Sequence, residues 1–375
     1  MSAHSPIAPS SAARRIQCPQ SSTLEARFPE EGESVEAREG VAAHWAVAEQ
    51  LEGRLIDVGQ VTPNGVVLTD EMTRGADMMF DSVTKALVPF GLQPRDCNIE
   101  QRVTIPRVHA VQFGSPDCYL LIERPGMPHL LLLWDYKFGH RQVEVFENAQ
   151  LVDYIAGACE GVDDRSPGVE VVATIVQPRS FSSAGPVRTW RTHLVDLRAL
   201  INVSHNAAQE ALGPQPRAQV GPECRDCTAR HACTLLQARG FAGMDEAKRI
   251  TPFVMDAPSA GLELRMLDEA ITLLNARRSG LAAQVESMAR NGQAVPGWAL
   301  RQGEAREGWV VPAAQVIAVG DMLGLKLAKP TEAITPNQAR AAGLDPDILK
   351  QYAKRGPAGL TLVADDGSLA RRTFG

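Results

Sequence analysis

An unbroken run of apolar residues, Leu130–Trp134, ends at Asp135 and is followed by Tyr136 and Lys137. Such a run predicts a strand that is buried on both faces. A second apolar run, Cys118–Ile122, comes shortly before it, and the Pro-Gly pair between them is typical of a turn. We therefore predict a β-hairpin built from these two runs.

Charged residues stand at one end of this hairpin. Asp117 opens the first run, and Asp135 closes the second. Because side chains alternate along a strand, Asp135 and Lys137 are expected to project to the same side. Two converging aspartates suit a hard cation such as Mg2+ or Mn2+, and a lysine beside them suits the activation of water for attack at phosphorus. A plain ion pair at the end of a sheet is the alternative interpretation.

The spacing of apolar positions predicts further elements on both sides of the hairpin. Helices are expected over residues 33–53, 69–87, 147–159, 196–212 and 262–289, and strands over residues 99–105, 169–176 and 187–195. Strand hairpins that alternate with helices indicate an α/β fold in which helices flank a mixed sheet.

Polar side chains on two of these helices are candidates for the charged end of the hairpin, which is called the corner below. His44 shares a stripe at helical spacing with three apolar residues, Val41, Ala48 and Leu51, so it is expected to face inward. It is either a hydrogen-bonded core histidine or a metal ligand. Gln150 and Tyr154 lie one turn apart on helix 147–159, either as surface groups or as part of the lining of a cleft.

Composition and charge exclude some classes of protein. The chain of 375 residues carries a net charge of -6, which leaves room for a local basic groove but excludes a surface that is basic throughout. No apolar run reaches the length of a membrane span. The first thirteen residues contain Ser, Ala and Pro without an apolar segment, so they are expected to be a disordered tail and not a signal peptide. A cytoplasmic location follows.

Seven cysteines in such a chain are better interpreted as thiols or metal ligands than as disulfides. Cys224, Cys227 and Cys233 lie within ten residues and offer three soft ligands. The fourth ligand is either His231, which would make a local Zn2+ site, or the distant Cys18. The remaining cysteines stand in or beside apolar segments and are expected to be structural: Cys97, Cys118 and Cys159.

The order Pro-Asp, then Asp-x-Lys, resembles the signature of the PD-(D/E)XK nuclease superfamily. Together with the four cysteines, it is similar to the RecB-like, iron-staple exonucleases of the CRISPR-associated and AddB type, and within them to an uncharacterised, often prophage-borne family. Four motifs carry this resemblance: Glu39-Gly40-x-x-x-His44, Gly114-x-x-Asp117, Asp135-Tyr136-Lys137 and Gln150-Leu-x-x-Tyr154. One departure is Gly-Ser-Pro-Asp at residues 114–117, where that family usually has Gly-Thr-Ala-Asp.

The resemblance implies a restriction-endonuclease-like fold over residues 14–240. The apolar pattern predicts a helical segment over 241–291, and the remainder, punctuated by Gly and Pro, predicts a small C-terminal domain over 292–375. It implies a metal held by His44, Asp117, Asp135 and the Tyr136 carbonyl, with Lys137, Gln150 and Tyr154 completing the catalytic set. It also implies a 4Fe-4S cluster held by Cys18, Cys224, Cys227 and Cys233.

The implied function is that of a metal-dependent DNA exonuclease that acts on single strands or ends, in phage DNA processing or recombination, alongside phage recombination or replication proteins. Five arginines are candidate phosphate contacts: Arg14, Arg15, Arg141, Arg225 and Arg230. The alternative is a DNA-binding or assembly protein that keeps the fold without turnover.

Overall fold

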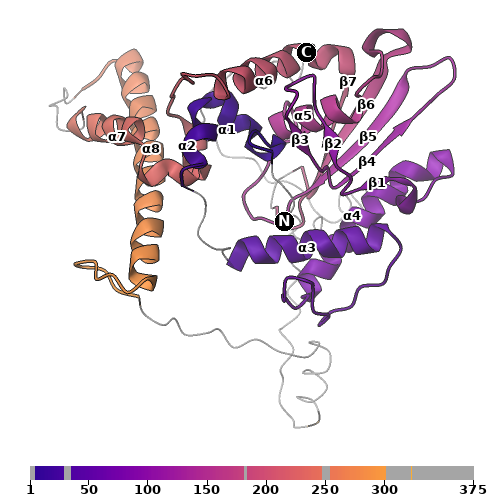
Figure 1. The fold of residues 1–375 in the computed structure, drawn as a ribbon, viewed down its shortest axis with the longest axis horizontal. Coiled ribbons are helices and arrows are strands. Elements are labelled where there is room, and N and C mark those ends of the chain that lie inside the picture. The colour runs from indigo at the N-terminus through magenta and orange to yellow at the C-terminus, as the bar shows by residue number, and fades with distance from the viewer. Residues whose placement is uncertain (1–4, 29–34, 181–183, 247–253, 301–321, 323–375) are drawn as a thin grey trace. The chain divides into compact units, whose positions relative to one another are not determined.

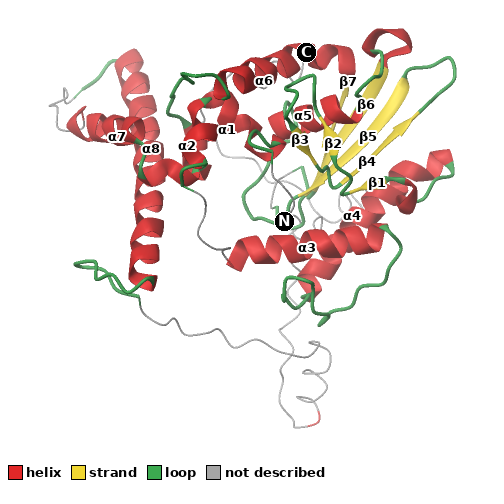
Figure 2. Cartoon of the chain, in the orientation of Figure 1, coloured by secondary structure: helices red, strands yellow, loops and turns green. Residues whose placement is uncertain are grey.

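The computed structural model describes residues 5–28, 35–180, 184–246, 254–300 and 322. The chain divides into two compact units, Met1–Ala328 and Lys329–Gly375, of which the second lies outside the described residues. Most of the predicted C-terminal domain, 292–375, therefore also lies outside them. The principal elements (Figures 1 and 2) are α1 Ala12–Gln17, α2 Gln20–Glu25, α3 Val35–Leu51, α4 Asp70–Leu87, β1 Asn98–Ile99, β2 Val103–Thr104, β3 Phe113–Gly114, β4 Cys118–Ile122, β5 His129–Tyr136, α5 Ala149–Ala158, β6 Val169–Val176, β7 Val187–His193, α6 Arg198–Ala211, α7 Thr234–Glu246 and α8 Ala257–Arg290.

A five-stranded mixed sheet lies at the centre of the first unit, in the order β1-β4-β5-β6-β7. The predicted hairpin of β4 and β5 is confirmed as an antiparallel pair, and β6 and β7 form the second predicted hairpin. Strands β5 and β6 are parallel, and helix α5 makes the crossover between them. The predicted α/β fold with a mixed sheet flanked by helices is confirmed.

The two faces of the sheet bury different helices. Leu131 and Leu133 of β5 pack into a core with residues of α5 and α6. Leu132 and Trp134, which alternate with them, pack into a second core with residues of α3 and α4. Strand β5 is thus buried on both faces, as its apolar run predicts. Figure 1 shows α5 and α6 on one side of the sheet and α3 and α4 on the other.

The predicted strand 99–105 is wrong as a single element. The chain forms β1 on the edge of the main sheet and then β2, which pairs with β3 in a separate two-stranded sheet. The break comes at Glu100, whose backbone has a φ of 49°. Positive φ is uncommon for a non-glycine residue and turns the chain out of the extended conformation. Because of this turn, the Glu100 side chain takes a different position from the one it would have in a continuous strand.

The prediction of a disordered tail over residues 1–13 is also wrong for its described part, residues 5–13. A 3-10 turn, Pro9–Ser11, leads directly into α1. Ile7 and Ala12 are fully buried, and Ile7 belongs to the core beneath α5. Burial of these apolar side chains offsets the entropy of ordering a segment that is otherwise rich in Ser and Pro.

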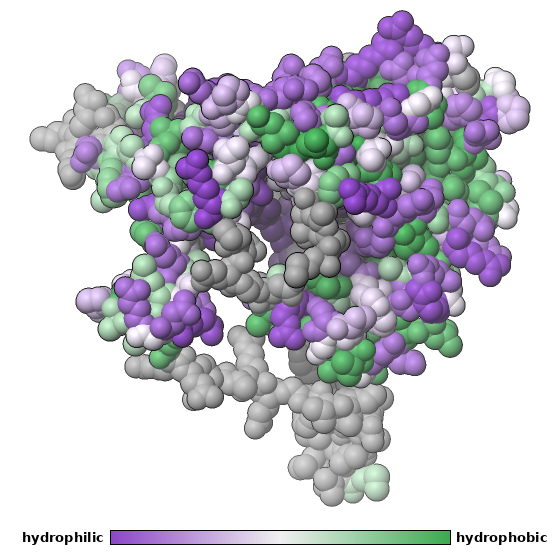
Figure 3. All heavy atoms as spheres, in the orientation of Figure 1, coloured by the Kyte–Doolittle hydropathy of each residue, from purple (hydrophilic) through white to green (hydrophobic). Residues whose placement is uncertain are grey.

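Helices α7 and α8 follow the segment that carries the late cysteines. Leu236 of α7 and two residues of α8, Leu273 and Ala276, form a small core against Cys224 and Cys233. Gly280 of α8 has no room for a side chain, because a Cβ would lie 2.8 Å from the His231 backbone nitrogen. Among the described helices, none has the length and apolarity that a membrane crossing requires. Hydrophilic and hydrophobic residues are intermixed over the face in Figure 3.

Candidate functional site

Two buried aspartates meet where β4 begins and β5 ends. Asp117 directly precedes β4, and Asp135 is the penultimate residue of β5. The register pairs Cys118 with Trp134, which places the two carboxylates on neighbouring strands at the same end of the hairpin. Their exposed fractions are only 8% and 3%. The Tyr136 backbone N–H donates to Asp117 Oδ2 at 2.5 Å, so the two strand ends are joined at this point.

Lys137 lies on the same side of β5 as Asp135, as alternation along the strand predicts. Its Nζ is 3.0 Å from Asp135 Oδ2 and donates to Gln150 Oε1 at 3.0 Å. Gln150 Nε2 in turn donates to Asp135 Oδ1 at 3.2 Å. Gln150 stands in the first turn of α5, where Asn148 caps the helix and fixes its start. Two hydrogen bonds and one ion pair therefore join the three side chains in a closed set.

Charge and burial oppose each other in this set. Burial, the larger influence, raises the pKa of Asp135 in spite of the nearby ammonium. Burial alone would lower the pKa of Lys137, but Asp135 and Asp117 raise it, so the amine stays protonated. Asp135 Oδ2 accepts no well-aligned hydrogen bond from the described residues. A buried carboxylate oxygen with acceptor capacity left is a suitable cation ligand.

His44 reaches the same corner from α3. Its Nδ1 lies 3.0 Å from Asp117 Oδ1, so the inward orientation expected for this side chain is confirmed. The helix face is nevertheless rotated from the predicted stripe, because Val41 is 49% exposed while Ala43 and Val47 are buried. Burial lowers the pKa of His44, but Asp117 and Glu100 outweigh burial and raise it to about 9.

Glu100 is a site residue that the sequence reasoning missed. Ligand atoms of His44, Glu100 and Asp117 all lie within 4.8 Å of one another, and Glu100 Oε1 is 3.9 Å from His44 Nδ1. Burial and the Asp117 charge raise the pKa of Glu100 to about 7. Glu100 falls within the predicted strand 99–105, where it had no assigned role.

An open cleft adjoins this corner. It is lined on one side by α3 and on the other by Glu100 and Asp117, and its residues on α3 include Gly40, Val41 and Trp45. A Cβ at Gly40 would meet no atom within 4 Å, so the helix surface here is open. A polyanionic ligand that entered this cleft would lie beside the acidic corner only with a cation between them.

The remaining predicted residues of the corner have defined places. The Tyr136 side chain is fully buried on the face of α4, where burial raises the pKa of its hydroxyl, and its ring lies edge-on to His44 with centroids 5.4 Å apart. Its carbonyl as a metal ligand stays a prediction. Tyr154 is 7% exposed and one turn beyond Gln150, where its ring lies against the Gly114 backbone. The Tyr154 side chain therefore bounds the site on its buried side.

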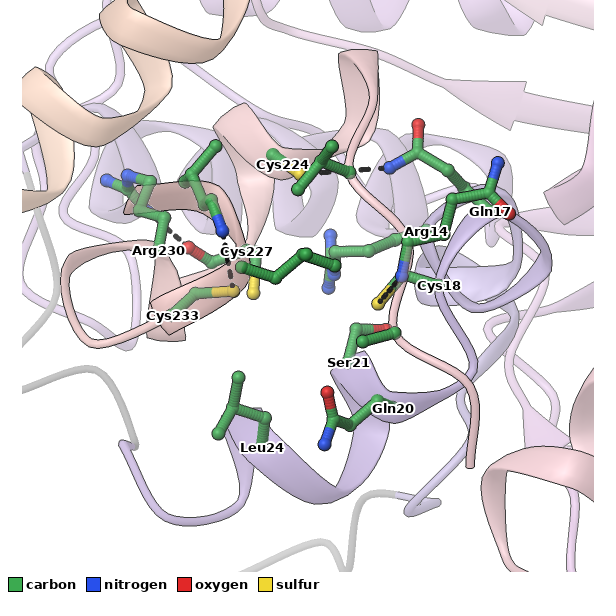
Figure 4. A pocket seen from close by; sticks show the side chains of 15 residues that line it. Arg14, Gln17, Cys18, Gln20, Ser21, Leu24, Cys224, Cys227, Arg230 and Cys233 are labelled. Atoms are coloured by element: carbon green, nitrogen blue, oxygen red, sulfur yellow. Dashed lines mark hydrogen bonds between the residues drawn. The ribbon is translucent and has the colours of Figure 1, made fainter. Parts of the chain in front are cut away.

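The four predicted cluster cysteines line one cavity. Cys18 follows α1, Cys224 lies in the 3-10 turn Pro222–Asp226, Cys227 directly follows that turn, and Cys233 directly precedes α7. Figure 4 shows these four side chains around a common space. Backbone N–H groups of Gln219, Gly221 and Leu236 donate to the sulfurs of Cys18, Cys224 and Cys233, each at 3.4 Å. At Cys224 the Gly221 N–H lowers the pKa of the thiol, but burial outweighs it and raises the pKa.

His231, the alternative fourth ligand, is not among the residues that line this cavity. Its Nδ1 lies 3.1 Å from the Thr228 carbonyl, and its ring packs edge-on against Phe28. The cavity is therefore lined by Cys18 and not by His231. Of the cysteines predicted to be structural, Cys118 and Cys159 are fully buried and Cys97 is partly buried.

The prediction of Arg15 as a phosphate contact is wrong. Its side chain is fully buried, and its guanidinium donates to Asp153 Oδ2 at 2.9 Å and to Ser204 Oγ at 3.0 Å. Arginine is rarely buried unless paired. This pairing joins residues 138 positions apart, so no local pattern could predict it.

The other four arginines lie around the cysteine segment. Arg14 and Arg230 line the cysteine cavity, where Arg14 pairs with Glu25 and Arg230 donates to the Cys227 carbonyl at 2.8 Å. Arg141 and Arg225 are about half exposed, and Arg141 Nη1 lies 2.8 Å from Asp226 Oδ2. Contact of these four with DNA stays a prediction.

A comparison with known protein families gives a match over most of the length of the chain. The match covers residues 4–336 and so includes the N-terminal segment, the acidic corner, all four cavity cysteines and α8. Because the match extends over well more than half of the 375 residues, the chain belongs to the family described as "Protein of unknown function (DUF2800)".

Proposed function

We propose that the protein is a divalent-metal-dependent DNA nuclease that hydrolyses phosphodiester bonds, with an exonuclease action on single strands or ends. The observation that carries the proposal is the meeting of Asp117, Asp135 and Lys137 at one end of a hairpin. This arrangement matches the PD-(D/E)XK signature that the sequence resembles, and a processing role in phage DNA metabolism agrees with that resemblance.

The residues of the corner fit Mg2+ or Mn2+. Asp117 and Glu100 provide hard oxygen ligands and His44 a nitrogen, with ligand atoms within 4.8 Å of one another. Asp135, at the end of the neighbouring strand, would add a third carboxylate. When bound, such a cation polarises a phosphoryl oxygen and lowers the pKa of water. Because His44 is protonated at neutral pH when it pairs with Asp117, it must release its proton to serve as a ligand.

Lys137 and Gln150 act on the nucleophile. The Lys137 ammonium is held between Asp135 and Gln150, with its other N–H directions available to a water molecule or a phosphate oxygen. From that position it orients the attacking water and stabilises the negative charge that develops at phosphorus. Gln150 fixes the amine and Asp135 together, so it sets the angle from which the water approaches.

The cysteine cavity is proposed to hold a 4Fe-4S cluster. Its ligands come from both ends of the nuclease unit, Cys18 and the Cys224–Cys233 segment, so the group would join them. We expect protein purified without oxygen to be brown and to contain iron, and Cys18→Ser to lose both properties. Colourless protein that contains one zinc ion per chain would contradict the cluster and leave the nuclease proposal standing.

Digestion of end-labelled single-stranded and double-stranded DNA tests the function. With Mn2+ or Mg2+, the anaerobically purified protein is expected to release short products from ends, and chelation of the cation is expected to stop release. Retarded DNA in a gel without products under any divalent cation would contradict the proposal and support a DNA-binding protein without turnover.

A further inference from the structure

A second group of buried polar residues lies outside the acidic corner. Arg15 of α1 and Asp153 of α5 are both completely buried and form an ion pair at 2.9 Å. Asp153 also accepts from Gln112 Nε2 at 2.7 Å and from Ser204 Oγ at 2.6 Å. Arg15 also donates to the Ile7 carbonyl at 3.0 Å. The pair therefore connects the N-terminal segment, α1, α5 and α6 in one hydrogen-bonded group.

Asp153 connects this buried group to the candidate catalytic residues, because it lies on the same helix, α5, as Gln150. Asp153 is three residues after Gln150 and one residue before Tyr154, so all three lie within one helical turn. Gln150 is the residue of α5 that bonds both Lys137 and Asp135. A rotation or shift of α5 that moved Asp153 would move Gln150 with it.

On the other side, Arg15 is three residues before Cys18. Gln17, between them, accepts from the Glu223 backbone N–H at 3.1 Å, and its amide lies 3.9 Å from Cys224 Sγ. Helix α1 is thus fixed at the cysteine cavity at its end and at α5 through Arg15. The buried pair is the polar connection between those two regions.

The ion pair adds little to the free energy of folding, and its main contribution is to fix how α5 is oriented against α1. Burial, the largest influence on both groups, raises the pKa of Asp153 and lowers that of Arg15 although each faces its opposite charge. Desolvation therefore outweighs the attraction, as is common for buried ion pairs. A hydrophobic pair of the same volume would keep α1 packed on α5, but without the directional bonds that fix the rotation of α5 and order its backbone.

We propose that Arg15 and Asp153 are positioning residues that set α5 against α1 and so hold Gln150 in register with Lys137 and Asp135. The inference rests on the proposed nuclease function for its catalytic consequence. Its structural consequence, an α5 ordered by the pair, can be measured without any activity.

The test compares the wild-type protein with Arg15→Met/Asp153→Leu, a double variant that removes the charges and keeps the volume. A matched control is Arg124→Met/Glu170→Leu, which removes a partly exposed ion pair between the β4–β5 turn and the start of β6. We expect the buried-pair variant to fold, to keep its KM for DNA and to lose at least tenfold in kcat. The control variant should keep both constants.

Two readouts separate positioning from a loss of stability. If the pair acts through Gln150, adding Gln150→Ala to the double variant should lower kcat no further than Gln150→Ala does alone. Hydrogen exchange in the double variant should become faster at the amides of α5 by more than at those of α3 and α4, which change only with the global free energy of unfolding. Multiplicative losses in kcat, or a kcat within twofold of wild type, would overturn the inference.

The proposed function and this inference fail in different ways. Wild-type protein that cleaves no DNA counts against the function alone, and hydrogen exchange then decides the inference. Unchanged exchange in α5 would overturn the inference whether or not DNA is cleaved.

Discussion

Replacing Arg15 and Asp153 singly and together gives a quantitative prediction of stability. Arg15→Met leaves the Asp153 carboxylate buried, although Ser204 and Gln112 still donate to it. We expect a loss of about 3 kcal/mol, near the lower end of the range for a broken buried ion pair. Asp153→Leu leaves the guanidinium with neutral acceptors only and also removes the acceptor of Gln112, so about 4–5 kcal/mol is expected.

The double variant should recover most of this loss. Two apolar side chains of similar volume replace a pair whose desolvation outweighs its attraction, so the remaining cost comes from the unpaired Ser204 and Gln112, about 1–2 kcal/mol. The two substitutions should therefore be non-additive by about 5–7 kcal/mol. Urea unfolding followed by tryptophan fluorescence measures each free energy of unfolding. Additive losses, or single losses below about 1 kcal/mol, would refute an unpaired buried charge as the cause.

Three further predictions concern the acidic corner and the core beside it. At pH 6 the metal-free wild-type protein should be more stable than the His44→Gln variant, by about 1 kcal/mol after solvent screening. Because folding raises the pKa of His44 from 6.5 to about 9, this difference should vanish as the pH rises through 9. Thermal melts of both proteins at pH 6 and pH 10 measure the difference. Lys137→Met should lower kcat about 10²–10³-fold in single-turnover digestion while Mn2+ affinity, measured by calorimetry, changes little; a kcat near wild type would remove Lys137 from the mechanism. Gly157→Ala should cost about 1–3 kcal/mol in urea unfolding, because its Cβ would lie 2.9 Å from Ile105 Cγ1 and 3.1 Å from the Thr104 carbonyl, whereas Gly40→Ala, with open space around its Cβ, should be neutral or stabilising.

The hairpin and its charged end could be predicted because the necessary information is local. An apolar run sets the strand, alternation places Asp135 and Lys137 on one side, and the turn returns Asp117 to the same end. Each step depends on residues within about one hairpin length, so long-range packing had little opportunity to override it.

Glu100 and Arg15 could not be predicted because their roles depend on distant contacts or rare conformations. Glu100 enters the corner through a positive φ that an ordinary Glu seldom adopts, and the local pattern favoured a continuous strand. Arg15 is buried only because Asp153 lies opposite. From the sequence alone an arginine beside a polar segment is expected at the surface.

The cysteine site lies between these cases. The spacing of Cys224, Cys227 and Cys233 predicts a soft-metal site from local sequence, but the choice between Cys18 and His231 depends on how the chain closes. The structure brings Cys18 to the cavity and turns His231 to Phe28. Gly280, which admits no side chain, lets α8 lie directly against the backbone of His231.

The central claim is that Asp135 belongs to a metal-dependent nuclease centre, and the substitution Asp135→Asn tests it most directly. The substitution keeps the volume and the bond to Gln150 but removes the charge. In single-turnover digestion of end-labelled DNA with Mn2+, the account predicts that wild-type protein and the surface control Asp81→Asn cleave at equal rates, while Asp135→Asn loses at least about 10³-fold. Equal cleavage by Asp135→Asn and wild type would contradict it.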